Sequence, residues 1–92
     1  MHAVVVSVTI DPGRAEEAQA RLESNVVPQV KQAPGAVSGY WTRSSDGEHG
    51  SGMVLFETEE AAREGAEAIS NMPRPDFVNF DSIEVREVVA QF

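Results

Sequence analysis

The chain contains no cysteine, one tryptophan and one tyrosine among its 92 residues. Without cysteine, neither a disulfide nor a thiolate metal site can stabilise the fold. A domain of this length buries only about 60–65% of the surface that its unfolded chain exposes, so its hydrophobic core is small. Oligomerisation is the remaining common way to enlarge such a core, and we expect it here.

Basic residues are also scarce, because 7 Lys and Arg stand against 15 Asp and Glu and leave a formal net charge of −8. A nucleic acid or an anionic membrane surface requires a basic face, so we expect neither as a partner. No stretch approaches the roughly 20 consecutive apolar residues of a membrane span. The N-terminal residues lead directly into a strand-like segment, without the pattern of a signal peptide. We therefore expect a cytoplasmic protein with one domain over residues 1–92.

Three segments have the composition of β-strands. Met1 to Ile10 is rich in β-branched residues at both alternating positions, which is typical of a central strand covered on both faces. Pro34 to Thr58 predicts a β-hairpin about Asp46-Gly47, with a two-residue type I′ turn. Ser82 to Phe92 predicts the last strand, and its adjacent valines predict a bulge near Glu87–Val89.

Two further segments have helical periodicity. From Ala15 to Val30, apolar residues recur at spacings of three and four, with Glu16, Glu17, Gln19 and Glu23 on the other side. Pro28 lacks a backbone donor, so this helix should kink near Asn25–Val27 or restart at the proline. Thr58 is suited to cap the second helix, whose narrow apolar stripe consists of Ala62, Ala66 and Ile69. Prolines then open an irregular segment, Pro73 to Asp81.

The register of the hairpin divides its side chains between two faces. Pairing across Asp46-Gly47 places Tyr40 opposite Met53 and Trp41 opposite Gly52. Gly50 and Gly52 should leave room beside the indole. One face then carries Val37, Gly39, Trp41, Arg43, Val54 and Phe56, and the other carries Ser38, Tyr40, Thr42, His49, Met53 and Leu55.

The order β-α-β-β-α-β predicts an α+β, ferredoxin-like fold with one antiparallel sheet and two helices on one face. The opposite face of the sheet would be apolar and uncovered, which usually marks an interface. We expect a second copy to pack sheet to sheet about a two-fold axis.

In these features the chain resembles the dimeric α/β-barrel superfamily, close to its antibiotic-biosynthesis-monooxygenase-like branch. The resemblance rests on residues 34–43, on Asp46-Gly47 and on residues 54–62, and in element order it covers nearly the whole chain. It implies a homodimer whose two sheets close into a barrel, with a cavity in each subunit between sheet and helices. Members include cofactor-independent oxygenases of quinols and anthrones, haem-degrading oxygenases, isomerases and proteins with no known activity.

The haem-degrading members require an Asn on the first strand together with a Trp and a His. The first strand here offers Ser7 and Thr9 but no Asn, and the hairpin register separates Trp41 from His49. We therefore do not expect haem degradation, and we expect no cofactor. The two histidines lack ligand spacing, so no metal site is predicted either.

The cofactor-free members use polar side chains to orient a phenolic substrate and to assist its deprotonation. By this resemblance we predict Tyr40, His49 and Arg74 as catalytic residues, and a substrate pocket lined by Trp41, Arg43, Asn71 and Phe77. Each assignment has a structural alternative. Trp41 could be core, Tyr40 could pack at the dimer face, His49 could be a solvated loop residue, and the two arginines could form ion pairs with the abundant carboxylates.

Two functions remain open. The first is a cofactor-independent monooxygenase that deprotonates a small hydrophobic or aromatic metabolite, whose carbanion then reacts directly with dioxygen. The second is a non-catalytic dimeric α/β-barrel domain that binds a small ligand or serves as a scaffold. A closed interior filled by Trp41, Leu22, Ile69 and Phe77 would favour the scaffold, whereas an open cavity of roughly 300 Å³ or more with convergent polar groups would favour a site.

Overall fold

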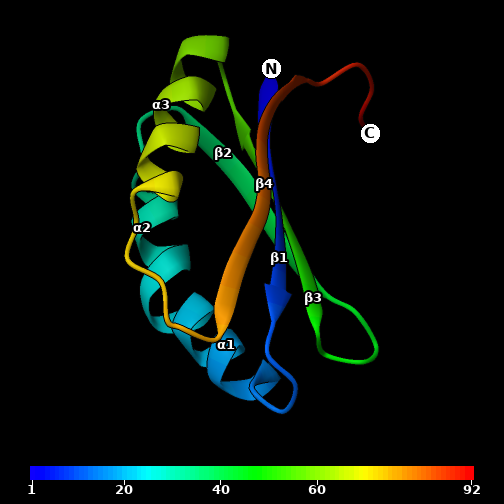
Figure 1. Cartoon of the computed structure of the whole chain (residues 1–92). Helices are drawn as coiled ribbons and strands as arrows, with labels where there is room; N and C mark the ends of the chain where they lie inside the picture. Colours follow the sequence, from blue (N-terminus) through cyan, green and yellow to red (C-terminus); the bar gives the residue numbers. More distant parts are fainter.

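The computed structural model describes all 92 residues and has the predicted element order. The elements are β1 (His2–Ile10), α1 (Ala15–Arg21), the π-helical segment η1 (Leu22–Val26), α2 (Val27–Lys31), β2 (Ala36–Arg43), β3 (His49–Phe56), α3 (Glu59–Ser70) and β4 (Val78–Glu87). The strands form one antiparallel sheet in the order β2-β3-β1-β4, and the helices cover one of its faces (Figure 1). This arrangement confirms the ferredoxin-like fold.

Strand β1 is central, as its β-branched composition predicts, because it pairs with β3 on one side and β4 on the other. Val4, Val6 and Ile10 are buried beneath the helices. Val4 also belongs to the main core cluster together with Phe56 of β3 and Ile69 of α3. The sheet and the third helix are therefore held together chiefly by apolar burial at the end of the molecule where these residues meet.

The first helical region breaks close to where Pro28 predicts, and the break takes the form of a π-turn. The N–H of Val27 donates to the carbonyl of Leu22, five residues back, instead of four. Pro28 has no N–H to continue the regular ladder, so the chain accommodates it by widening one turn and restarting as α2.

The hairpin register is confirmed, since Tyr40 lies opposite Met53 and Trp41 opposite Gly52. The type I′ turn is wrong. Gly47 has a positive φ of 76° but Asp46 does not, and the N–H of Gly47 donates to the carbonyl of Ser44 at 2.9 Å. The carbonyl of Glu48 accepts from Ile10 at 2.7 Å, so β1 takes the group that a two-residue turn would have used.

Two details of the hairpin faces differ from the prediction. The register shifts between Ala36 and Ser38, so Val37 is a bulged residue and is 49% exposed rather than covered by the helices. Gly50 lies against Val8 and not against the indole. The residues that accommodate Trp41 are Gly52, as predicted, and Gly39.

Strand β4 begins and ends earlier than predicted. It starts at Val78, within the segment expected to be irregular, and it ends at Glu87, which lies opposite His2 at the start of β1. Beyond Glu87, the N–H of Val88 still donates to the carbonyl of Met1 at 3.0 Å, but Met1 precedes β1 and residues 88–92 are not part of the sheet. The bulge lies at Asp81, whose carboxylate accepts a 2.6 Å hydrogen bond from Thr9, and not at Glu87–Val89.

Helix α3 begins as predicted, because the hydroxyl of Thr58 accepts a hydrogen bond of 3.1 Å from the N–H of Ala61. Ala62 and Ile69 of the expected stripe are buried, and Gly65 is buried with them. A Cβ at Gly65 would lie 2.4 Å from Cζ of Phe56, so a glycine here lets the helix approach the sheet.

The face of the sheet away from the helices carries large exposed side chains. Tyr40 is 67% exposed and Met53 is 45% exposed. Arg86 forms an ion pair with Glu84 on the same face of β4. No helix in the chain combines the length and the apolar character needed to span a membrane.

Candidate functional site

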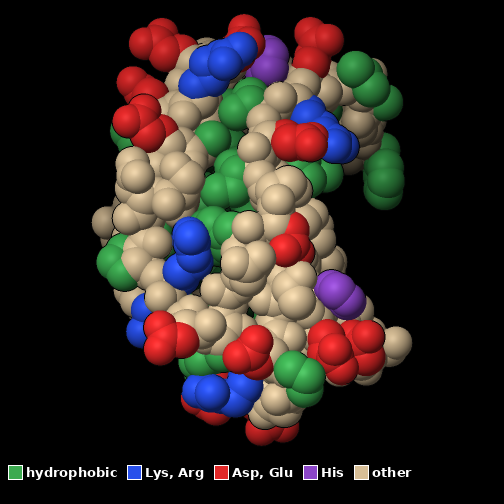
Figure 2. All heavy atoms as spheres, in the orientation of Figure 1, with side chains coloured by type: hydrophobic (Ala, Val, Ile, Leu, Met, Phe, Trp, Pro, Cys, Tyr) green, Lys and Arg blue, Asp and Glu red, His purple; other side chains and the backbone are tan.

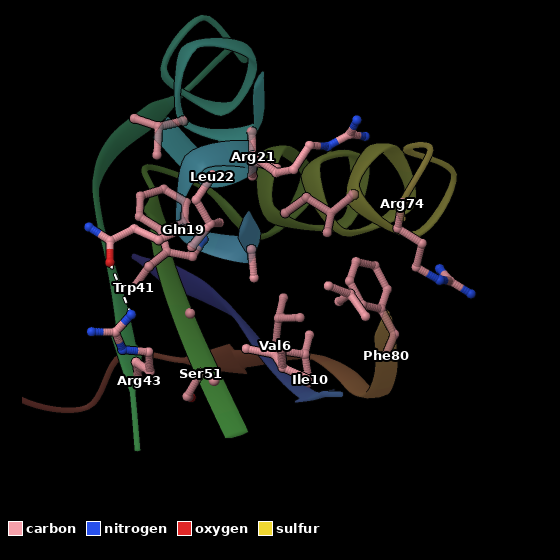
Figure 3. Close-up of a pocket in the computed structure, with 18 of the residues that line it drawn as sticks. Val6, Ile10, Gln19, Arg21, Leu22, Trp41, Arg43, Ser51, Arg74 and Phe80 are labelled. Atoms are coloured by element: carbon pink, nitrogen blue, oxygen red, sulfur yellow. Dashed lines mark hydrogen bonds between the residues drawn. The ribbon is translucent and has the colours of Figure 1, made fainter. Parts of the chain in front are cut away.

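A cavity of about 520 Å³ lies between the helices and the sheet (Figure 3). Its walls come from β1, β2 and β3 below, from the helical region α1–η1–α2 above, and from the segment that leads into β4. Most of the wall is apolar. The apolar lining includes Val6, Val8, Ile10, Leu22, Val26, Val30, Trp41, Val54, Ile69, Met72, Val78 and Phe80.

Trp41 forms one end of this apolar wall. A Cβ at Gly52 would lie 2.8 Å from Cδ1 of the indole, and a Cβ at Gly39 would lie 2.8 Å from Cη2. The indole therefore lies against the backbone of β2 and β3, in space that only glycines leave free. Figure 3 shows it on the opposite side of the cavity from Phe80.

A chain of polar contacts joins the sheet to the helices beside Trp41. Nη1 of Arg43 donates to Oε1 of Gln19 at 3.2 Å, and Nε2 of Gln19 donates to Oε1 of Glu23 at 2.8 Å. Figure 3 shows the first of these bonds as a dashed line. All three residues line the cavity, so this side of it is polar and hydrogen-bonded.

The other side of the cavity is formed by an aromatic ring and a cation. The guanidinium carbon of Arg74 lies 4.5 Å from the ring centroid of Phe80, within the range of a cation–π contact. Arg21 also lines the cavity, and Figure 3 shows its side chain extending toward the same side as Arg74. Figure 2 shows a strip of hydrophobic side chains between α3 and β4, with a basic side chain beside it.

Of the predicted pocket residues, Trp41 and Arg43 line the cavity, and so does Arg74 of the predicted catalytic set. The other two predicted pocket residues do not. Asn71 borders a separate cavity of about 310 Å³ between α2 and α3. Phe77 packs with Ile10 and Ala18 in a second core cluster, because the chain turns there into β4.

Tyr40 and His49 lie on the opposite face of the sheet from the cavity. Tyr40 neighbours Trp41 in β2, and consecutive residues of a strand point to opposite faces. His49 is exposed and lies opposite Thr9 of β1. The structure thus does not bring either side chain to Arg74 within one chain, and the catalytic roles of all three stay predictions.

Three lining residues, Gln19, Arg21 and Glu23, were not predicted as part of a site. Gln19 and Glu23 lie four positions apart and so share one helix face, but the hydrophobic pattern assigns that face to solvent. The kink predicted from Pro28 was the sequence feature that could have indicated their place at the cavity, since a widened turn re-orients the residues around it.

The structure contains no group of three or more His, Asp or Glu side chains that could hold a metal ion. The acidic groups whose pKa values are shifted also lie outside the cavity. Hydrogen bonding from Arg14 lowers the pKa of Glu17, and hydrogen bonding from Arg63 lowers the pKa of Glu59. The chemistry that the cavity offers is therefore that of an apolar slot with guanidinium groups at both sides.

Neither a known family model nor a curated protein sequence matches this chain. Solved structures do. The haem-degrading protein MhuD of Mycobacterium tuberculosis, with two haems bound in its active site, is 19% identical over 100% of this chain and 99% of its own, with a TM-score of 0.79. The monooxygenase ActVA-Orf6 of Streptomyces coelicolor, in complex with nanaomycin D, is 18% identical over 99% of this chain and 89% of its own, with a TM-score of 0.67. A dimeric ferredoxin-like protein from an uncultured marine organism is 12% identical over 100% and 98%, with a TM-score of 0.68.

These similarities cover the whole architecture at low sequence identity, so they establish the fold. The chain has the subunit fold of the antibiotic-biosynthesis-monooxygenase-like dimeric α/β barrels, which confirms the resemblance found in its sequence. The same fold carries haem degradation in one neighbour and a monooxygenase in another, so function has to be argued from the cavity.

Proposed function

We propose that this protein binds a small hydrophobic, aromatic metabolite in the cavity beneath its helices and oxidises it as a cofactor-independent monooxygenase. The observation that carries this proposal is the cavity itself. Its volume of about 520 Å³ falls in the range of roughly 300–1,000 Å³ typical of small-molecule sites. A scaffold would instead be expected to fill this space with its own side chains.

The composition of the walls supports an aromatic ligand. Trp41 and Phe80 offer ring surfaces at two sides of the cavity, and aromatic pairs prefer offset or edge-to-face contacts. The floor between them consists of the branched side chains of β1, including Val6 and Val8. A flat apolar molecule would bury most of its surface there.

The chemistry requires that a phenolic substrate lose its proton before dioxygen reacts. Arg74, held over Phe80, is the predicted catalytic residue that lines the cavity. A guanidinium close to the phenol would favour the phenolate over the neutral form. The resulting carbanion reacts with dioxygen, one oxygen atom enters the product and the other leaves as water, and the substrate supplies the electrons.

One observation favours the second candidate, a non-catalytic domain that binds the same kind of ligand. Neither Tyr40 nor His49 lines the cavity, so its wall carries no imidazole to exchange a proton near neutral pH and no phenol to donate a hydrogen bond. Oxidation then depends on the arginines alone to promote ionisation of the substrate. The two candidates share the ligand and differ in turnover.

The proposal includes a homodimer formed through the face of the sheet opposite the helices. Its support is the exposure of Tyr40 and Met53 on that face. The ferredoxin-like neighbour from the marine organism is a dimer. Two sheets packed face to face would cover these side chains and supply the additional core that so short a chain needs.

Oxygen uptake with a panel of anthrones and naphthohydroquinones tests the proposal, with uncatalysed oxidation as the blank. We expect uptake above the blank, and we expect Val26→Phe, which fills the cavity, to abolish it. Val89→Phe is the matched control, because Val89 is 87% exposed and outside the cavity. Circular dichroism of both variants shows whether they fold.

The same variants separate the two candidates when binding is measured with the neutral fluorophore N-phenyl-1-naphthylamine. Binding that Val26→Phe removes, without oxygen uptake for any substrate, would favour the non-catalytic domain. Absence of both binding and uptake in the folded wild type would contradict the proposal.

A further inference from the structure

We infer that the ligand is an aromatic acid, whose carboxylate or sulfonate group binds Arg43 while its ring lies against Trp41. This inference rests on the proposed function and narrows its substrate class. It starts from the distribution of charge in the structure, and in particular from the cations that have no acidic partner.

The basic residues divide into two groups. Arg14, Arg63 and Arg86 form ion pairs with Glu17, Glu59 and Glu84 respectively. The remaining four, Arg21, Lys31, Arg43 and Arg74, form none. Three of these four line the cavity.

This separation is notable in a chain with 15 acidic residues, where carboxylates outnumber cations about two to one. Ion pairs with protein carboxylates, which were the structural alternative for Arg43 and Arg74, are absent. The cavity wall carries three arginines and one glutamate, Glu23, so its formal charge is 3 − 1 = +2, against −8 for the chain. An apolar cavity with this local charge favours a ligand that is both hydrophobic and anionic.

Arg43 is the arginine best placed to bind the acid group. It lies two positions after Trp41 on β2, so both side chains leave the same face of the strand (Figure 3). A ring stacked on the indole would bring a substituent at its edge toward the guanidinium. Arg43 carries five N–H donors in a planar fork suited to a carboxylate, and only one of its nitrogens is bonded within the chain.

The partner of Arg43 orients the guanidinium without neutralising it. Gln19 accepts from Nη1 through a neutral amide oxygen at 3.2 Å, and its own amide nitrogen donates to Glu23 at 2.8 Å. The only acidic side chain on the wall is thus held by an amide rather than by an arginine. The positive charge of Arg43 stays available to a ligand.

Two fluorescent probes with the same ring system test the inference. 8-Anilino-1-naphthalenesulfonate carries one sulfonate, and N-phenyl-1-naphthylamine is the same molecule without it. Binding of each is followed by probe fluorescence and by quenching of Trp41, the only tryptophan in the chain. We expect the sulfonate to bind about tenfold tighter or more, since a hydrogen bond to a charged group contributes at that scale. Added NaCl should weaken binding of the sulfonate probe and leave binding of the neutral probe unaffected.

The variant Arg43→Gln should remove most of this preference, because it should weaken binding of the sulfonate probe far more than binding of the neutral probe. Arg63→Gln is the matched control, because it removes the same charge from an exposed ion pair on α3. A preference that survives Arg43→Gln, or that Arg63→Gln reduces equally, would overturn the inference. Equal binding of both probes to the wild type would also overturn the inference while leaving the proposed function intact. If neither probe binds and no substrate gives oxygen uptake, both the inference and the proposed function are rejected.

Discussion

The indole of Trp41 occupies the space above Gly52, across the pair of strands β2 and β3. A Cβ at position 52 would lie 2.8 Å from Cδ1 and 2.9 Å from Nε1 of the ring. The glycine therefore determines where the indole lies, and the indole forms one wall of the cavity. Gly52 lines the cavity as well, so a change there should alter the ligand site both directly and by moving the indole.

We expect Gly52→Ala to displace the indole and to change the shape of the cavity. Overpacking of this kind costs about 1–3 kcal/mol of unfolding free energy. The emission maximum of the single tryptophan should shift, and N-phenyl-1-naphthylamine should bind more weakly. Ser38→Ala, exposed on β2 and outside the cavity, is the control. Unchanged emission and binding in Gly52→Ala would show that the ring is not held by this contact.

A second close contact, between Gly65 of α3 and Phe56 of β3, should determine the stability of the helix–sheet packing. Alanine stabilises a helix by about 1 kcal/mol relative to glycine. A Cβ at position 65, however, would lie 2.4 Å from the phenyl ring. We expect Gly65→Ala to lower the unfolding free energy by about 1–3 kcal/mol in urea titrations.

Phe56→Leu provides the test of this explanation. With the ring removed, the clash should disappear, so Gly65→Ala should be neutral or stabilising in the Phe56→Leu background. Equal destabilisation by Gly65→Ala in both backgrounds would mean that the added Cβ does not clash with Phe56.

The N-terminus of α3 depends on the hydroxyl of Thr58, which accepts a hydrogen bond from Ala61. Thr58→Ala should cost about 1 kcal/mol of unfolding free energy, because one helix N–H loses its partner. Thr58→Ser keeps the hydroxyl and should restore most of the loss. Urea denaturation measures both, and equal stability of the two variants would contradict the capping role.

The loop between β2 and β3 should contribute to the loss of stability in acid. The carboxylate of Asp46 accepts hydrogen bonds from the Ser44 hydroxyl at 2.6 Å and from the N–H of Glu48 at 2.8 Å, and these lower its pKa below the usual range. A carboxyl whose pKa is lower in the folded state adds stability above its unfolded pKa and loses it as pH falls through the folded pKa. We expect this contribution to decline below about pH 4.

An NMR titration of the Asp46 carboxyl carbon checks the cause of this shift. Ser44→Ala should raise the pKa of Asp46, because it removes the largest favourable contact. Ser45→Ala, at the exposed neighbouring position, should leave the titration unchanged. The same midpoint in Ser44→Ala and wild type would exclude the hydroxyl as the cause.

The proposed dimer can be tested at Met53, which lies 45% exposed on the open face of the sheet. Met53→Glu places a charge where two sheets would pack, so we expect light scattering to show the dimer mass for wild type and the monomer mass for the variant at micromolar concentration. Ala20→Glu, exposed on α1, is the control. A monomeric wild type would reject the sheet-to-sheet dimer.

Features that depend on neighbouring residues could be predicted from the sequence. The element order follows from local periodicity, and the cap at Thr58 follows from a hydroxyl placed before a run of helix-forming residues. The hairpin register follows from the two-residue alternation of strands, which also placed Tyr40 and Trp41 on opposite faces. Their separation therefore followed from sequence alone, although the resemblance to the family had suggested Tyr40 as a catalytic residue.

Features that depend on pairing between distant segments could not be predicted. Strand β4 ends at Glu87 because β1 begins opposite it, at His2, and Glu48 leaves the expected turn because its carbonyl accepts from Ile10. The cations of the cavity belong to this class as well. Arg43 meets Gln19, 24 positions away, and no local pattern shows which of many surrounding side chains will be its neighbour. The sequence by itself determined that Arg43 shares a strand face with Trp41, whereas only the packing of helix on sheet decided that its charge has no acidic partner.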